Sequence, residues 1–293
     1  MTLLRAVAKT SSSMLNSLKF YWYILKRNPL TMVGLSIIVA LVFIGLFAPW
    51  LSPYDPNKTN PEEVLQSPTL AHPFGTDIWG RDTLTRIFYA TSLDLSLAMS
   101  SVCIAAAIGV MIGAVLGYIG GRLDELVMRI VDALLAFPSF ILGMALMVAL
   151  GAGISNLLIT QTFIRIPIFT RTVRGEMLSV KQNEYAEAAV CVGNSDLRTI
   201  FYHLFPNCIT PTIVLITMNF GYAILEIAAL SFLGLGIKPP TAEWGLEVAY
   251  GAPYLVTGLW YLSFFPGLFI VLAVLAFNLI GDGIRDLLEK RVR

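Results

Sequence analysis

Long stretches without a charged residue constrain this sequence more than any other feature. Residues 30–51 and 95–121 contain no Asp, Glu, Lys or Arg. A helix needs roughly 20 apolar residues to cross about 30 Å of hydrocarbon, and both stretches are long enough. The whole chain is 56% hydrophobic and only 13% charged, which is about half the charge of a soluble domain. This composition excludes a disordered or coiled-coil protein and indicates one that spans a lipid bilayer.

Six membrane spans are predicted from such stretches. Residues 133–164 carry no charge but are too long for one span, and the Gly-Ala-Gly-Ile-Ser-Asn sequence at 151–156 supplies a turn that divides them. The predicted fold is therefore an all-α integral membrane protein of six transmembrane helices. The predicted spans are residues 30–51, 95–121, 130–150, 154–170, 208–230 and 256–280.

The predicted division of the chain follows from these spans. A cytoplasmic segment (1–29) precedes the first anchor (30–51), and an extracytoplasmic loop (52–94) leads to a five-helix core (95–281) that ends in a cytoplasmic tail (282–293). Segment 1–29 has five basic residues and no acidic residue, and it lacks an apolar core with a cleavage site. We therefore expect the first span to be a retained anchor and not a cleaved signal peptide.

The distribution of Lys and Arg predicts the orientation in the membrane. With the N-terminus inside, fifteen of the 20 basic residues fall on inner segments and four on outer segments, while Arg165 lies within the fourth span. Inner loops of membrane proteins are enriched in Lys and Arg, so both termini are expected in the cytoplasm. The four outer basic residues are Lys58, Arg81, Arg86 and Lys238.

Small residues recur every four positions along the second span. They form a stripe on one helix face that lets another helix backbone approach closely. We expect this stripe to pack within one bundle, and a seam between subunits is the alternative. Three prolines, Pro138, Pro167 and Pro266, lie in or at the ends of spans and predict kinks, for which a gating role is a hypothesis. The stripe consists of Ser101, Ala105, Gly109, Gly113, Gly117 and Gly121.

Residues that carry out catalysis or bind metals are scarce. The sequence has no G-x-x-x-x-G-K-[ST] phosphate loop, no HExxH and no G-x-S-x-G motif. His72 and His203 are the only histidines, and Cys103, Cys191 and Cys208 form no CxxC pair. We therefore predict a non-catalytic chain with no metal site and no bound cofactor. The net charge of +1 also argues against a nucleic-acid partner.

The inner segment 171–206 has the most informative pattern. Its middle, Asn183–Val192, is rich in strong helix formers and predicts a short helix. Gly193-Asn194 is expected to end this helix in a left-handed turn, and Ser195-Asp196 to start a second helix near Leu197. Small side chains would let the first helix sit in a groove of another protein. An amphipathic connector lying on the membrane surface explains the pattern equally well.

One motif in this segment resembles a known family. Glu187-Ala188-Ala189, then Gly193 after three residues, and later Ile200 and Pro206 are similar to the "EAA" loop of ABC importer permeases, which docks on the ATP-hydrolysing subunit. Phe205-Pro206 stands where the family usually has Leu-Pro.

Further motifs narrow the resemblance to the C-type permease subunit of the dipeptide/oligopeptide/nickel transport group. They occur in the same order as in that group, and the resemblance covers about Lys26 to Arg293. The motifs are HPFGTDIWGRD at 72–82, SFLGLG at 231–236, EWG at 243–245, PGL at 266–268 and AFNLIGDGIRD at 276–286.

The resemblance implies the type-I importer permease fold in the inner membrane. This chain and a second homologous permease, as a heterodimer, would form the pathway for di- or oligopeptides by alternating access. Two ATPase subunits would bind ATP and Mg, and an extracytoplasmic solute-binding protein would deliver the solute. Nickel, an oligosaccharide or another small solute are alternatives. The residues implied in ATPase coupling are Glu184, Tyr185, Ala186, Glu187, Ala188, Ala189 and Gly193.

Charged residues at membrane depth are costly and point to a partner or an aqueous cavity. Arg165 in the fourth span and Glu226 in the fifth are candidate pathway residues, with Arg165 attracting a carboxylate such as a peptide terminus. An Arg165–Glu226 ion pair and snorkelling of Arg165 to the inner interface are the alternatives. Asp94 is expected to open the second span at the interface.

Two other classes of function are less compatible with the sequence. A secondary transporter driven by an ion gradient would show an inverted repeat and acids at the midplane, and Glu226 is the only candidate acid. A membrane-embedded enzyme would need a cluster of titratable or metal-binding residues, and no such cluster is present in the sequence.

Overall fold

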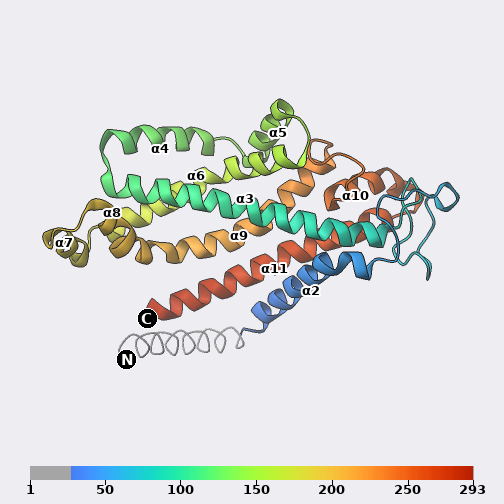
Figure 1. The fold of residues 1–293 in the computed structure, drawn as a ribbon, viewed down its shortest axis with the longest axis horizontal. Coiled ribbons are helices and arrows are strands. Elements are labelled where there is room, and N and C mark those ends of the chain that lie inside the picture. Colours follow the sequence, from blue (N-terminus) through green and yellow to red (C-terminus); the bar gives the residue numbers. More distant parts are fainter. Residues whose placement is uncertain (1–27, 293) are drawn as a thin grey trace, which may run out of the picture.

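The computed structural model of this chain describes residues 28–292, so the predicted N-terminal segment lies almost wholly outside the described residues. Within them the regular structure is helical, apart from one isolated bridge between Thr76 and Asp82. Figure 1 shows the long helices running side by side along one axis of the molecule. They are α2 (Pro29–Leu51), α3 (Thr83–Ile119), α6 (Ile154–Val180), α9 (Phe205–Phe232) and α11 (Tyr261–Val292).

Shorter helices fill the connections. The connection from α3 to α6 consists of α4 (Gly121–Leu135) and α5 (Ser139–Leu150). The segment between α6 and α9 forms α7 (Glu184–Cys191), α8 (Asp196–Arg198) and a π-helical turn, η2 (Thr199–Leu204). At the other end of the bundle lie η1 (Pro61–Glu63), α10 (Trp244–Gly251) and η3 (Ala252–Thr257) (Figure 1).

The predicted spans agree with the long helices in position but not always in length. The first matches α2 closely. The second begins at Thr83, because the Asp82 carboxylate caps the helix by accepting the Thr85 N–H at 2.8 Å. The predicted loop 52–94 therefore ends at residue 82. The predicted tail 282–293 is helical as far as residue 292.

The predicted third span over 130–150 is not one continuous helix. The chain is broken there, and α4 and α5 meet at an angle of 91°. Pro138, which has no backbone N–H, lies at the break just before α5. Pro167 and Pro266, in contrast, lie inside α6 and α11, which continue past them.

The count of six spans stays a prediction that the structure is compatible with. Among the described helices, four are long and apolar enough to cross a membrane, and the bent pair α4–α5 would make a fifth. Helix α6 carries Arg165, Arg171 and Arg174 and is not among them. It nevertheless packs against α3 within the bundle.

The two ends of the described chain lie at the same end of the bundle. Asn28, which caps α2, donates a side-chain hydrogen bond to Asp286 of α11 at 3.3 Å. In Figure 1 the end of α11 lies on the same side as α7. This agrees with both termini facing one compartment, and the choice of the cytoplasm rests on the positive-inside prediction.

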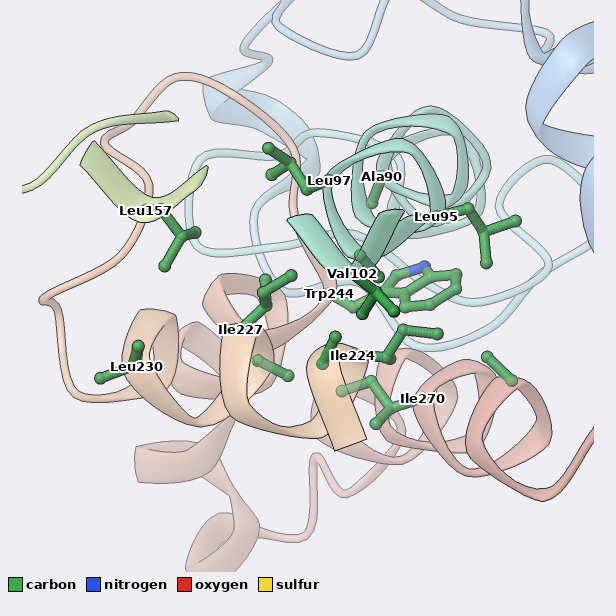
Figure 2. Close-up of a cluster of buried hydrophobic side chains, with 14 of the residues drawn as sticks. Ala90, Leu95, Leu97, Val102, Leu157, Ile224, Ile227, Leu230, Trp244 and Ile270 are labelled. Carbon is green, nitrogen blue, oxygen red and sulfur yellow. The ribbon is translucent and has the colours of Figure 1, made fainter. Parts of the chain in front are cut away.

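A hydrophobic core joins α3, α9, α10 and α11. Trp244 of α10 is fully buried at its centre, between Val102 of α3, Ile224 of α9 and Ile270 of α11 (Figure 2). The indole N–H of Trp244 donates to the main-chain oxygen of Ile87 at 3.2 Å, so the polar atom of this large side chain is satisfied.

The small-residue stripe of α3 packs against α6 within the chain, as expected. A Cβ atom at Gly109 would lie 2.7 Å from the Cβ of Phe169, and one at Gly113 would lie 2.5 Å from the main-chain oxygen of Thr170. Gly117 meets Met177 in the same way. The alternative of a seam between subunits is therefore wrong for these three glycines, because α6 already occupies the face.

Replacing Gly113 with leucine is expected to destabilise the bundle by about 1–3 kcal/mol, because the backbone of α6 would have to move away from α3. Gly175 in α6 provides a matched control, since a Cβ atom there meets nothing within 4 Å. Thermal unfolding of the detergent-solubilised chain should show a lower midpoint for Gly113→Leu and no loss for Gly175→Leu. Equal midpoints for the two variants would contradict the close packing.

Candidate functional site

The predicted short helix of segment 171–206 is present as α7. It begins after Asn183, whose main-chain oxygen accepts the Ala186 N–H at 2.9 Å. The helix ends at Gly193, whose φ of +83° places it in the left-handed region that favours glycine. The Gly193 N–H donates to the Val190 oxygen at 2.9 Å, which satisfies one carbonyl of the last turn.

One face of α7 is buried and the other is open. Ala186 and Ala189 are buried, and Ala186 belongs to a small core with Ile200 and Leu204 of η2 and Met177 of α6. The small alanine side chains allow α7 to lie close to η2. This packing makes α7 part of a folded unit and not a loose loop.

The outer face of α7 combines acids with exposed apolar groups. Glu184, Glu187 and Ala188 are exposed, and so are Tyr185 and Val190. Val192, directly after the helix, is 83% exposed. Apolar side chains that are exposed together are typical of a surface that another protein or a lipid bilayer covers. We call this face, which consists of Glu184, Tyr185, Glu187, Ala188, Val190 and Val192, the α7 face.

Contacts from α3 hold the segment in place. The Tyr118 hydroxyl donates to Asp196 of α8 at 3.1 Å. The Lys181 ammonium donates to the main-chain oxygens of Tyr118 at 3.0 Å and Gly117 at 3.5 Å. Because Gly117 also packs against Met177, the end of α3 contacts both sides of the segment. These contacts attach the residues before and after α7 to the end of α3.

The candidate pathway residues Arg165 and Glu226 form an ion pair, which is one of the alternatives that the sequence left open. Their side chains meet at 2.7 Å, and Arg165 is buried. Arg165 also donates to the main-chain oxygen of Gln161 at 3.0 Å and to its side-chain oxygen. The second Glu226 oxygen accepts the Ser139 hydroxyl at 2.6 Å. The pair thus joins α6, α9 and the first residue of α5.

At the opposite end of the bundle, the sequence motif at 72–82 forms a compact loop around His72. The ring of His72 is buried and contacts the carboxylates of Asp82 at 2.9 Å and Glu63 at 3.4 Å, and Tyr54 stacks on it. Asp82 also caps α3. This histidine therefore has a structural role in fixing the start of α3.

Arg86 is the centre of a buried charged cluster that the sequence did not reveal. Its side chain is 0% exposed and bonds the Glu247 carboxylate at 2.6 and 2.9 Å. It also donates to the main-chain oxygens of Pro56 at 2.7 Å and Pro240 at 3.3 Å. A single guanidinium thus holds together the loop that precedes α3, α3 itself and α10. No spacing signal links two residues that are 161 positions apart.

The EWG motif connects the same region to α3. Burial raises the pKa of the Glu243 carboxyl to about 7, although its oxygens accept the backbone N–H groups of Gly245 at 2.9 Å and Leu246 at 2.7 Å. Asp94 does not open its helix as predicted, because α3 already begins at Thr83. Asp94 is buried within α3 and accepts the Trp244 N–H at 2.9 Å, because the backbone of α10 packs there.

Together, the apolar helices define a multi-pass membrane protein, and the exposed α7 face lies at one end of its bundle. Comparison with known proteins gives the class. Residues 109–293 match the family model of the binding-protein-dependent transport system inner membrane component. Residues 19–68 match the N-terminal transmembrane domain of oligopeptide transport permease C.

Individual relatives are similar in sequence to this chain over nearly its whole length. The dipeptide transport system permease protein of Alkalihalophilus pseudofirmus is 42% identical over 92% of this chain and 88% of its own length. A probable D,D-dipeptide transport system permease protein of Escherichia coli is 40% identical over 98% and 95%. A glutathione transport system permease protein of Shigella boydii is 38% identical over 93% and 90%.

A solved structure shares the fold. A crystal structure of an amino acid ABC transporter with histidines matches 71% of this chain and 94% of its own with a TM-score of 0.50, at 15% identity. The chain belongs to the binding-protein-dependent inner membrane permeases of ABC transporters. Within them it is a C-type permease of the dipeptide/oligopeptide/nickel group, a multi-pass protein of the inner membrane.

Proposed function

We propose that this chain is one half of the translocation pathway of an ATP-driven importer and that its α7 face docks on an ATPase subunit. The observation that carries the proposal is that α7 presents an exposed acidic and apolar face on a helix that is fixed to the bundle by buried alanines. The Glu184–Ala189 sequence and Gly193, which resemble the coupling loop of this family, lie in or directly after this helix.

Short peptides are the proposed solute. The relatives are named for dipeptides, D,D-dipeptides and glutathione, which all consist of a few linked amino acids. A second homologous permease would complete the pathway, and an extracytoplasmic binding protein would load it. ATP and Mg would bind to the partner ATPases and not to this chain, which has no phosphate loop.

The contacts of segment 171–206 support a mechanism of alternating access. Closure of the two ATPases would push α7, and the contacts of Tyr118 and Lys181 would pass the movement to α3 and α6. A packed bundle with two discrete arrangements can convert a small displacement into a change of the open side. Arg165 and Glu226 remain candidate pathway residues, with Glu226 the more exposed of the two side chains.

Replacing Glu187 with lysine, or Gly193 with tryptophan, is expected to leave the complex assembled and to uncouple it. Uptake should fall roughly 5–150-fold, the range of a typical coupling free energy, while ATP hydrolysis continues. Both positions are exposed, and a side chain at Gly193 meets nothing within 4 Å in this chain, although its φ is strained. Peptide uptake and ATP hydrolysis are measured on the same proteoliposomes.

The native Cys191 provides a direct test of docking, because it is exposed at the end of α7. A cysteine-to-lysine crosslinker should join Cys191 to an ATPase subunit, and Cys191→Ser should abolish the product. Cys103 in α3 is exposed but lies away from α7, so it is the internal control. Normal uptake in both coupling variants together with no crosslink at Cys191 would remove the coupling role. A secondary transporter would also show uptake without any ATPase.

A further inference from the structure

A cavity of about 370 Å³ lies between α4 and α6, away from both α7 and the Arg165–Glu226 pair. Met128 lies on its wall, and all other lining side chains are charged. We call it the charged trough. Its charged residues are Asp124, Glu125, Arg129 and Asp132 of α4 with Arg171 and Arg174 of α6.

One ion pair of the trough is structural. Arg174 bonds both carboxylate oxygens of Asp124, at 2.5 and 2.7 Å, and the Asp124 side chain is only 9% exposed. Such a bidentate pair fixes the distance between two helices. Asp124 and Arg174 thus attach α4 to α6 and form the base of the trough.

The other two ion pairs are open to solvent. Arg129 and Glu125 meet at 2.5 Å with side chains 75% and 64% exposed. Arg171 and Asp132 are paired with side chains 49% and 54% exposed. Exposed ion pairs contribute little to stability, so these four side chains can exchange partners at low cost. An arriving ligand can therefore replace one member of each pair.

The signs of the charges restrict the ligand. Three guanidinium groups and three carboxylates line the trough, so it has no net charge. A simple anion would be repelled by the carboxylates and a simple cation by the guanidinium groups. A zwitterion can place its ammonium against Asp132 or Glu125 and its carboxylate against Arg171 or Arg129. The volume lies within the roughly 300–1,000 Å³ typical of small-molecule sites.

The other face of α4 is apolar, which indicates that the trough lies on the water-facing side of this helix. Leu123, Leu126 and Ile130 are exposed and follow one another at spacings of three and four residues, so they form an apolar stripe. Such a stripe needs lipid or protein beside it, whereas the charged side needs water. From Asp124 to Asp132 the trough extends about 12 Å along α4. The helix thus separates an apolar environment from an aqueous one.

We propose that the charged trough binds the zwitterionic main chain of a short peptide in transit, with Arg171 and Asp132 contacting its opposite termini. This inference rests on the proposed function. It assigns the binding of both peptide charges to the side chains that line the trough. Arg165 has no part in this binding, because its charge is paired with Glu226. A zwitterionic lipid headgroup such as phosphatidylethanolamine has the same chemistry, and the experiment separates the two sources.

The first measurement removes both charges without changing the net charge. In the assembled transporter, Asp132→Asn with Arg171→Gln should lower the maximal uptake rate of alanyl-alanine roughly tenfold, as expected for the loss of charge-assisted hydrogen bonds. The KM should stay unchanged, because the binding protein captures the solute. Arg122→Gln is the matched control on the same helix, since Arg122 is exposed but does not line the trough. Normal uptake by the double variant would overturn the proposal.

The second measurement detects binding without transport. In a Cys103→Ser, Cys191→Ser background, a Met128→Cys variant of the assembled transporter is labelled with a neutral maleimide. Alanyl-alanine should slow labelling, and N-acetyl-alanyl-alaninamide, which carries neither charge, should not. Equal protection by both peptides, or by neither, would contradict the proposal. Protection without peptide that requires phosphatidylethanolamine, and is lost in phosphatidylcholine vesicles, would assign the trough to lipid and also overturn it.

The two measurements separate failure of the inference from failure of the proposed function. If the unmodified transporter does not take up alanyl-alanine, the proposed peptide solute is wrong, and the labelling measurement still tests the trough directly. If uptake is normal in the unmodified transporter and also in the double variant, only the assignment of the trough is wrong.

Discussion

Replacing Arg86 with alanine is expected to destabilise the end of the bundle opposite α7 by about 3–5 kcal/mol, the largest effect that we expect of any substitution. The Glu247 carboxylate would keep its burial and lose its cation, and the Asp77 carboxylate 3.8 Å away would lose a second positive charge. The main-chain oxygens of Pro56 and Pro240 would lose their donor as well.

Limited proteolysis and thermal unfolding in detergent measure this effect. We expect cleavage within residues 52–82 to become faster in Arg86→Ala, because the loop loses its attachment to α3 and α10. The cleavage rate of Arg86→Lys should lie between those of Arg86→Ala and the unmodified protein, since an ammonium keeps the charge but cannot donate two parallel hydrogen bonds as the guanidinium does. Arg122→Ala, an exposed arginine, should behave as the unmodified protein. Unchanged proteolysis of Arg86→Ala would show that the cluster does not hold the loop.

Replacing Arg165 with alanine is expected to have the second largest effect. The Glu226 carboxylate would lose its cation and keep the hydrogen bond from the Ser139 hydroxyl, and its side chain is only 17% exposed. The cost is about 3 kcal/mol, at the lower end for a broken buried pair because the carboxylate keeps some access to water. We expect a lower unfolding midpoint and a looser attachment of α5 to α6 and α9.

A second substitution separates structure from transport. Adding Glu226→Gln to Arg165→Ala removes the unpaired charge and should restore most of the stability. If Arg165 also attracts a solute carboxylate, peptide uptake should stay low in the double variant. If its role is structural only, uptake should recover together with the unfolding midpoint. No change in stability in Arg165→Ala alone would mean that the ion pair contributes nothing.

The α7 region shows how far local sequence signals reach. The strong helix formers predicted a helix, and glycine at 193 predicted its end, because both effects act within a few residues. The structure has α7 at Glu184–Cys191 and Gly193 at positive φ. The side chains that pack under α7 come from α6 and η2, which no local rule identifies.

The third span shows where the same approach fails. A charge-free run predicts that a segment lies in an apolar environment, but it does not show whether the helix is continuous. Pro138 predicted only a kink, whereas α4 and α5 meet at 91°. Asp124 helps to fix the path of α4, because its bidentate ion pair with Arg174 attaches the helix to α6.

Local and compositional properties of the chain were therefore readable directly: the membrane environment, the approximate positions of the helices, the glycine stripe and the family motifs. Each of these properties depends either on residues that are neighbours in the sequence or on the summed composition of a segment. The Arg86 cluster and the charged trough became visible only in three dimensions, and only the structure decided between the alternatives for Arg165. The ion pairs that join different helices in them link groups 39 to 161 positions apart, and such groups meet only when the packing of the bundle brings their helices together.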